Sequence, residues 1–260
     1  MRIAYLQSAE IDILGERVLN LINNRHIVCI RDFPDDKHKM AELLWKIGHP
    51  VWVNDPEFHP NIEVMQNIDD GKWYNESHAW PSHVDGMMSH VDGTHEHFPI
   101  TVMLAHRLDQ VHGGVTYFHD MVEVFETLSE AEKHLFRSQH AAYQHPTNVG
   151  SRLIRDVPLV RRDRYWLREF PVWDEWFFRF LERDQGNRKT NLLNVALAEK
   201  SKLFRYDHSW REHDMLIWTN EGFTHGRTAI TGGHREMWRA IVRDQERVKA
   251  RFYPPEPEDA

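Results

Sequence analysis

Two short motifs pair a histidine with an aspartate two residues later, a spacing that can bind a metal ion. They are His83-Val-Asp85 and His90-Val-Asp92. Residues i and i+2 of a strand share one face, so an imidazole and a carboxylate placed in this way can converge on one ion. Because the chain holds 19 histidines, such a pair can arise by chance and needs a further ligand. Each pair alone could equally be a polar turn that binds no metal.

A third ligand from a distant histidine would complete a facial set of two histidines and one carboxylate. This set is typical of non-haem Fe(II) oxygenases, because it leaves three positions of the ion open for a co-substrate and O₂. His208, His213 and His225 are candidates for the third ligand. The same kind of site could instead hold zinc and activate a water molecule for hydrolysis.

Composition restricts the setting and the partners of such a site. The single cysteine, Cys29, excludes an internal disulfide and a cysteine-built metal site, and it fits a reducing compartment. The net charge of −8 is opposite in sign to what a nucleic acid attracts. The chain has no apolar run of membrane-spanning length and no secretory signal pattern at its start. We therefore expect a cytoplasmic protein that binds neither nucleic acid nor membrane.

Hydrophobic periodicity predicts the elements that must position these side chains. Helical spacing covers residues 10–24, 40–47 and 121–136, and the last stretch contains Ser129 and Glu132 at capping-box spacing, which would divide it into two helices. Residues 173–184 also suggest a helix, and the arginine-rich residues 152–168 suggest a loop with short strands. Strand-like runs occupy residues 26–33, 61–67, 100–106, 115–118, 203–206, 215–218 and 237–242.

Short strands with turn signals therefore lie on both sides of a helical middle. The fold class we predict is α+β, mainly β, with a double-stranded β-helix (jelly-roll) core and flanking helices. A chain of 260 residues can bury one sizeable core. We expect a single domain over residues 1–253, followed by a flexible tail at 254–260.

Four elements in a fixed order resemble the taurine dioxygenase-like (TauD/TfdA) family of Fe(II)- and 2-oxoglutarate-dependent dioxygenases. They are His90-Val-Asp92, Gly113-Gly-Val-Thr116, Asn220-Glu-Gly-Phe-Thr-His225 and Arg235-Glu-Met-Trp-Arg239. The resemblance runs from His90 to Val242 and continues weakly toward the N-terminus. The distance from His90 to Gly113 fits the family pattern better than the longer distance from His83. The resemblance therefore favours the second His-Val-Asp pair.

The resemblance implies that Fe(II) is bound by His90, Asp92 and His225, the histidine that precedes the two arginines. It also implies that Arg235 and Thr116 hold the far carboxylate of 2-oxoglutarate. That carboxylate needs a fixed cation, preferably a guanidinium that can bond both oxygens.

The second arginine, Arg239, has a less defined implied role. If residues 235–239 form a strand, Arg235, Met237 and Arg239 face the barrel interior while Glu236 and Trp238 point away. Arg239 could then bind a substrate anion or the inner end of 2-oxoglutarate.

The implied reaction is oxidation of a small substrate by O₂, with 2-oxoglutarate converted to succinate and CO₂. Hydroxylation is the expected outcome, and Asp92 disfavours halogenation because related halogenases replace this carboxylate with a small residue. A contact with Arg239 would suggest an anionic or amino-acid-like substrate. The alternatives are a zinc hydrolase with the same ligands and a jelly-roll binding module without catalysis.

Overall fold

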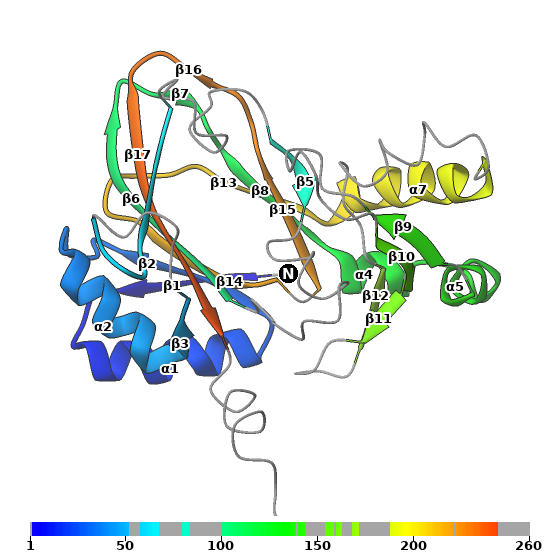
Figure 1. The fold of residues 1–260 in the computed structure, drawn as a ribbon, viewed down its shortest axis with the longest axis horizontal. Helices are drawn as coiled ribbons and strands as arrows, with labels where there is room; N and C mark the ends of the chain where they lie inside the picture. Colours follow the sequence, from blue (N-terminus) through cyan, green and yellow to red (C-terminus); the bar gives the residue numbers. More distant parts are fainter. Residues whose placement is uncertain are drawn as a thin grey trace, which may run out of the picture.

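The computed structural model describes the chain in segments. These are residues 2–51, 58–67, 80–83, 100–138, 140–143, 154–158, 160–162, 168–171, 188–220 and 222–243. Two β-sheets formed by these segments lie opposite each other, and the helices α1 (Ile11–Asn23) and α2 (Lys37–Ile47) cover the outer face of the larger sheet (Figure 1).

The larger sheet has the strand order β1-β2-β14-β6-β17-β3, and β4 also pairs with β17. The first two strands are parallel, and the other described pairs of this sheet are antiparallel. The strands are β1 (Arg2–Gln7), β2 (His26–Arg31), β3 (His49–Pro50), β4 (Glu63–Gln66), β6 (Ile100–Asp109), β14 (Met215–Thr219) and β17 (His234–Arg243).

The smaller sheet is antiparallel and has the order β13-β8-β15-β5. Its strands are β5 (Trp80–His83), β8 (Thr116–Asp120), β13 (Arg205–His208) and β15 (Phe223–Arg227). A short pair, β7 (His112–Gly113) with β16 (Ile230–Thr231), joins two of the connections between the sheets. The chain crosses from one sheet to the other between β4 and β5, β5 and β6, β6 and β8, β13 and β14, β14 and β15, and β15 and β17. This connectivity is that of the predicted jelly roll.

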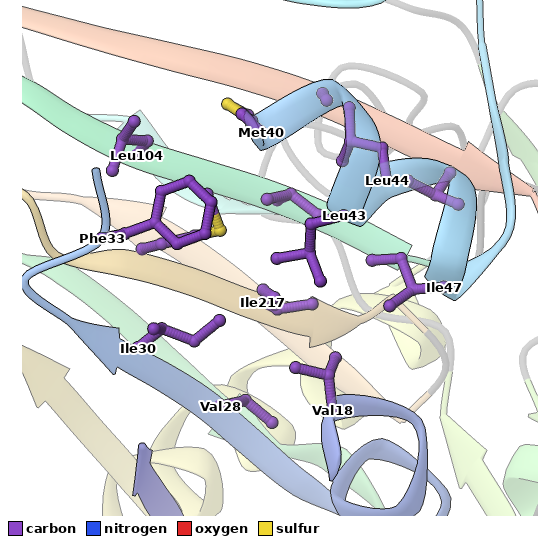
Figure 2. Close-up of a cluster of buried hydrophobic side chains, with 14 of the residues drawn as sticks. Val18, Val28, Ile30, Phe33, Met40, Leu43, Leu44, Ile47, Leu104 and Ile217 are labelled. Carbon is purple, nitrogen blue, oxygen red and sulfur yellow. The ribbon is translucent and has the colours of Figure 1, made fainter. Parts of the chain in front are cut away.

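An apolar cluster fills the space between the two helices and the larger sheet (Figure 2). The helices contribute residues at the helical spacing seen in the sequence, and the strands contribute alternate residues. Phe33, which follows β2, is 1% exposed. The labelled members of the cluster are Val18, Val28, Ile30, Phe33, Met40, Leu43, Leu44, Ile47, Leu104 and Ile217.

A second apolar cluster lies between the two sheets. Its members include Met103 of β6, Phe118 of β8 and Met237 of β17. The strand β14 serves both clusters, because Ile217 packs toward the helices while Trp218 packs toward the smaller sheet. A strand that is buried on both faces needs apolar residues at consecutive positions, which explains the unbroken apolar run in β14.

Smaller elements extend from one end of the smaller sheet. The predicted capping box is present, since Glu132 N–H donates to Ser129 Oγ at 3.3 Å and Ser129 N–H donates to Glu132 Oε2 at 2.7 Å. It begins a separate helix, as the sequence predicted. The elements are α4 (Met121–Glu126), α5 (Glu130–Arg137), α7 (Arg188–Ser201), the 3₁₀ turn η1 (Lys202–Phe204), β9 (His140–Tyr143), β10 (Ile154–Pro158), β11 (Val160–Arg162) and β12 (Glu169–Pro171).

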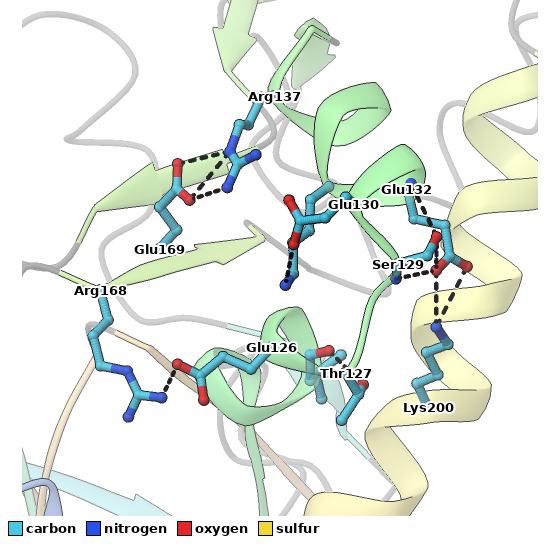
Figure 3. Close-up of polar contacts among 11 residues, drawn as sticks. Glu126, Thr127, Ser129, Glu130, Glu132, Arg137, Arg168, Glu169 and Lys200 are labelled. Carbon is cyan, nitrogen blue, oxygen red and sulfur yellow. Dashed lines mark hydrogen bonds and ion pairs between the residues drawn. The ribbon is translucent and has the colours of Figure 1, made fainter.

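Ion pairs connect these peripheral elements (Figure 3). Arg137 of α5 donates to both carboxylate oxygens of Glu169 in β12, at 2.6–3.1 Å. Arg168, at the end of the arginine-rich stretch, pairs with Glu126 of α4. The part of this stretch that is described thus forms short strands and surface ion pairs, as expected of a loop region with short strands.

Some sequence-based boundaries were wrong and some elements were missed. The strand predicted at 203–206 begins only at Arg205, because residues 202–204 continue α7 as a 3₁₀ turn in which Leu203 is 78% exposed. No sequence pattern predicted the strands β1, β3, β5, β7, β9, β15 and β16 or the helix α7. The helix predicted at 173–184 and the tail predicted at 254–260 lie outside the described residues. Within the described part of the chain, no helix has the length and apolar character needed to cross a bilayer.

Candidate metal and co-substrate site

His225 lies in the middle of β15, and its side chain is buried between the two sheets. The residue is 7% exposed. Its ring packs against Trp218 of β14, with ring centroids 5.0 Å apart, and against Phe118 of β8, at 6.2 Å. Because both neighbours are fully buried, the imidazole is held in a restricted orientation. The histidine predicted as the distal ligand therefore lies in the interior of the jelly roll.

Of the residues in the two His-Val-Asp pairs, only His83 belongs to the described part of the chain. His83 is the last residue of β5, and its Cα lies opposite the Cα of His225 in the antiparallel register. Directly opposite residues of antiparallel strands have Cα atoms about 4.5–5.5 Å apart. His90 and Asp92, the pair that the sequence favoured, lie outside the described residues, and so does Asp85.

Arg235 is a buried cation on β17 with 3% of its surface exposed. Its Nη2 atom is buried and has no hydrogen-bond partner among the described residues. Burial, and to a smaller degree the charge of Arg227, lowers the pKa of Arg235 to about 9. The guanidinium therefore stays charged at neutral pH. A buried charged donor without an acceptor is costly, so this geometry fits the binding of an anion.

The inner face of β17 carries the three residues that the sequence placed there. Met237 belongs to the cluster between the sheets, whereas Trp238 belongs to the cluster under the helices. The indole N–H of Trp238 donates to Glu236 Oε1 at 3.1 Å, which shows that these two residues share the outer face. The strand alternation therefore places Arg235 and Arg239 on the inner face, as predicted.

Arg239 has a carboxylate partner on the neighbouring strand β4. Its Nε and Nη2 atoms donate to Glu63 Oε2 at 3.0 and 2.7 Å. Both side chains are 15% exposed. The charge of Arg239 is thus balanced by a charge-assisted pair, and it offers less net positive charge to the interior than the sequence suggested. Its contact with a substrate or co-substrate anion stays a prediction.

The Gly113-Gly114 turn brings the backbone close to Arg235. The two glycines have φ of 77° and 66°, a region that favours glycine. A Cβ on Gly113 would lie 2.1 Å from the carbonyl oxygen of Ala229, and a Cβ on Gly114 would lie 3.5 Å from Arg235 Nε. Glycine is therefore needed at position 113 for the turn to pass next to the guanidinium.

Thr116 follows this turn at the start of β8 and is 4% exposed. Its Oγ1 accepts a hydrogen bond of 2.9 Å from the indole Nε1 of Trp210. A threonine hydroxyl that accepts one bond still has its own proton to donate. Its contact with the carboxylate of 2-oxoglutarate stays a prediction.

Two residues near this site were missed in the sequence analysis. Trp210 lies in the loop between β13 and β14, and no motif marks it. Arg227 is 9% exposed and lies opposite Thr116 in the register of β15 and β8. A signal for Arg227 existed, because it follows His225 by two residues and therefore shares its face of the strand.

A cavity of about 550 Å³ adjoins the glycine turn and reaches Arg235. Its volume is within the range of small-molecule sites. Its lining includes Gly113, Gly114, Trp210, Arg211, Glu212 and Arg235. A small anion can therefore approach the buried guanidinium.

The described residues fit the groups that the resemblance implies. The imidazole of His225 is a suitable ligand for Fe(II). Arg235 and Thr116 provide a buried cation and a hydroxyl for a carboxylate, as 2-oxoglutarate requires. The described residues thus account for one of the three predicted metal ligands and for the predicted carboxylate donors.

Comparison with known proteins finds matches over nearly the whole chain. A family model described as "Taurine catabolism dioxygenase TauD, TfdA family" matches residues 3–241. Among solved structures, a taurine dioxygenase from Burkholderia xenovorans has a TM-score of 0.69 at 12% identity and covers 92% of this chain and 86% of its own. AAD-2, solved in complex with Mn(II) and N-oxalylglycine, also has a TM-score of 0.69, at 14% identity, and covers 92% of this chain and 93% of its own.

Two further relatives extend this comparison. PvcB from Pseudomonas aeruginosa has a TM-score of 0.66 at 17% identity and covers 92% of this chain and 85% of its own. The structural likenesses confirm the predicted jelly-roll fold. Pentalenolactone F synthase from Streptomyces arenae is 26% identical over 155 residues, which are 50% of this chain and 52% of that protein. The matched segment thus spans about half the length of this curated relative.

Proposed function

The chain belongs to the taurine catabolism dioxygenase TauD, TfdA family, and from this premise we propose that it hydroxylates a small organic substrate. Family membership confirms the predicted enzyme class, an oxidoreductase that depends on Fe(II), 2-oxoglutarate and O₂. It also implies a small-molecule substrate. The proposed reaction couples substrate hydroxylation to the conversion of 2-oxoglutarate into succinate and CO₂.

The proposed iron site consists of His225 and one of the two His-Val-Asp pairs. The sequence favoured His90 and Asp92 by their distance from the glycine turn. The register of β5 and β15 instead supports His83, because its Cα lies opposite that of His225. Directly opposite residues of an antiparallel pair lie on the same face of the sheet, and Asp85 follows His83 by two residues in the sequence. We therefore assign the ligands to the first pair, with the second pair as the alternative to be tested.

The observation that carries the proposal is the buried guanidinium of Arg235. Its Nη2 atom lacks a hydrogen-bond partner among the described residues, and it lies on the inner face of the barrel beside the glycine turn. A dicarboxylate whose inner end chelates iron would place its outer carboxylate against such a cation. Thr116 would donate a further hydrogen bond to the same carboxylate.

When bound, iron would activate O₂, which is the oxidant, and 2-oxoglutarate would supply two of the four electrons that reduce it. The protein's own residues bind and orient these groups and exclude water. Trp218 and Phe118 fix the ring of His225 and line the interior next to it with apolar surface. This packing limits the access of water to the metal side of the barrel.

The pairing of Arg239 with Glu63 supports a restriction on the substrate. A simple anion at Arg239 would have to compete with a carboxylate that is already bound there. A neutral or zwitterionic substrate, such as an amino acid, can instead use both partners of the pair. We therefore favour an amino-acid-like substrate over a simple carboxylate or sulfonate.

The two alternatives considered for the sequence gain no support. A zinc hydrolase would leave the buried Arg235 and its neighbour Thr116 without a function. A binding module without catalysis does not fit membership in a dioxygenase family.

The proposed function is tested by measuring succinate release from 2-oxoglutarate in the presence of Fe(II) and O₂. The purified chain is screened against amino acids, neutral small molecules, carboxylates and sulfonates. Substrate-dependent succinate, with a product 16 mass units heavier than the substrate (the mass of one oxygen atom), is the expected result. Succinate release that stays at the level of an iron-free control across all classes would refute the proposal.

A further inference from the structure

Three potential metal ligands cluster at a second place, on elements other than the strand β15 that carries His225. Cys29 lies on β2, His208 ends β13, and Asp214 immediately precedes β14. Their ligand atoms all lie within 4.8 Å of one another, and all three residues are buried. The cluster joins the larger sheet to the smaller one. The single cysteine of the sequence argues against a site built from cysteines, but the fold adds an imidazole and a carboxylate to it.

The imidazole of His208 is the least satisfied member of the cluster. The residue is 2% exposed, and its Nε2 atom is buried without a hydrogen-bond partner among the described residues. This nitrogen faces Asp214 Oδ2 at 3.5 Å, the outer limit of a hydrogen bond, so it points into the cluster. The ring is held from the side by Trp210, whose ring centroid is 4.8 Å away. A buried ring nitrogen without a partner is unfavourable unless a ligand satisfies it.

Asp214 is anchored through one of its two oxygens. Arg31 and the backbone N–H of Arg211 both donate to Oδ2. The other oxygen, Oδ1, can therefore coordinate a metal while Arg31 keeps the carboxylate in place. This anchoring fixes one ligand, as carboxylate ligands of metal sites are usually fixed by hydrogen bonds.

We infer that Cys29, His208 and Asp214 form a second metal site that takes a zinc-like divalent ion. Thiolate, imidazole and carboxylate are all zinc ligands, with bond lengths of about 2.0–2.3 Å. Tetrahedral coordination at these lengths puts ligand atoms roughly 3.5 Å apart. The three ligand atoms, which lie within 4.8 Å of one another, would have to come about 1 Å closer together. Rotation of the side chains can supply this movement. Water would complete the coordination.

Charge balance is compatible with such a site. A cysteine binds a divalent metal as the thiolate, so Cys29 has to lose its proton when the metal binds. Metal binding would replace this proton, which is released to solvent. The thiolate and the carboxylate then bring two negative charges against the ion and the nearby Arg31.

The consequence of metal binding would be structural and not catalytic. His208 and Asp214 bracket the loop that carries Trp210, and Trp210 donates its hydrogen bond to Thr116. A metal that joins both ends of this loop to β2 would fix Trp210 in place. The second site would therefore stabilise the co-substrate pocket through Trp210 and its hydrogen bond to Thr116.

Anaerobic titration of the metal-free protein with Co(II) tests this inference. Cys29 is the only thiol in the chain, so a sulfur-to-cobalt charge-transfer band in the near ultraviolet can come only from this site. The expected result for the unmodified chain is this band, saturating with a second equivalent of Co(II), and a higher melting temperature. If Co(II) occupies the iron site but the band is absent, the inference is overturned. This holds even if Co(II) also binds to other histidines.

Variants separate the two sites. Cys29→Ser should lose the band and the second equivalent of Co(II) but keep Fe(II) binding at the site of His225. His225→Ala should lose metal at the iron site but keep the band. A band that disappears in His225→Ala would contradict a separate site, as would an unchanged Co(II) stoichiometry in Cys29→Ser. If Cys29→Ser does not fold, the presence or absence of the sulfur-to-cobalt band in the unmodified chain decides whether the second site exists.

Discussion

The Cα of His83 lies opposite the Cα of His225 in the antiparallel pair of β5 and β15. The two residues are separated by most of the chain, yet the sheet brings their backbones next to each other. With Asp85, two residues after His83, these histidines would provide the two imidazoles and one carboxylate of a facial set of ligands. This register leads us to assign the proposed iron ligands to His83, Asp85 and His225.

Alanine substitutions in the two His-Val-Asp pairs distinguish the assignments. We expect His83→Ala to weaken Fe(II) binding by more than about 100-fold, because loss of a direct ligand should exceed the 10–100-fold cost of losing an outer-shell partner. His90→Ala is the matched control and should change the affinity less than about 3-fold. Anaerobic competition with a coloured chelator measures both. The reverse pattern would return the assignment to His90 and Asp92.

Replacement of Arg235 tests the carboxylate site. Arg235→Gln should weaken 2-oxoglutarate binding by about 2–5 kcal/mol, or roughly 30-fold to 4,000-fold, because a buried carboxylate would lose its charged partner. Arg235→Lys keeps the positive charge but lacks the planar guanidinium that can bond both carboxylate oxygens. Its affinity for 2-oxoglutarate should therefore lie between those of the unmodified chain and Arg235→Gln. Calorimetry with the Fe(II)-loaded protein, or with Mn(II) in its place, gives the affinities.

An exposed arginine on the neighbouring strand provides the control for Arg235. Arg107 of β6 is 55% exposed at its side chain and pairs with Asp109. Arg107→Gln should leave the affinity for 2-oxoglutarate unchanged. Equal effects of the two substitutions, or an effect of Arg235→Gln below 3-fold, would show that the guanidinium does not hold the co-substrate.

The apolar cluster under the helices should dominate stability. Phe33→Ala removes a side chain that is 1% exposed and should lower the free energy of unfolding by about 3–5 kcal/mol through lost burial and a residual cavity. Ile13, on the exposed side of α1, is 48% exposed, so Ile13→Ala should cost less than about 1 kcal/mol. Urea unfolding of both variants provides the comparison. A cost for Phe33→Ala below that for Ile13→Ala would place the stabilising core elsewhere.

The buried His119 should make stability depend on pH. Burial, and to a smaller degree the charge of Arg205, lowers its pKa from 6.5 to about 4. Between these values the unfolded chain binds a proton that the folded chain does not, so acidification favours unfolding. We expect a loss of up to about 3 kcal/mol as the pH falls from 6.5 to 4, since one pKa unit corresponds to about 1.36 kcal/mol.

Urea unfolding at several pH values measures this contribution. In His119→Gln the decrease in the free energy of unfolding between pH 6.5 and 4 should be smaller than in the unmodified chain by most of this contribution of about 3 kcal/mol. His112 is exposed on β7, and His112→Gln serves as the control that should keep the slope of the unmodified chain. If His119→Gln and the unmodified chain lose stability in parallel, His119 is not the responsible group.

Local patterns predicted much of the fold. The helical spacing of Leu14, Val18 and Ile22 predicted the bounds of α1 to within one residue. The Ser129–Glu132 capping box correctly divided the helical stretch at 121–136 into two helices. Strand alternation also placed Arg235 on the inner face of β17. These features depend on neighbours in the sequence, which is why the sequence alone contained them.

Features that depend on pairing between distant strands could not be predicted from local sequence patterns. The Phe-Thr-His-Gly-Arg sequence of β15 lacks an apolar alternation, because its inner face carries His225 and Arg227. The choice between two identical His-Val-Asp motifs requires the register with β5. The pairing of Arg239 with Glu63 likewise arises only from the contact of β17 with β4.

The central claim is that this chain holds Fe(II) and 2-oxoglutarate together between His225 and Arg235. Anaerobic addition of both to the metal-free protein tests it through the weak visible charge-transfer band of the iron chelate of 2-oxoglutarate. The band should appear at one equivalent of each, vanish in His225→Ala, and require far more 2-oxoglutarate in Arg235→Gln. Failure of the unmodified chain to give the band, or its full persistence in both variants, would contradict the claim.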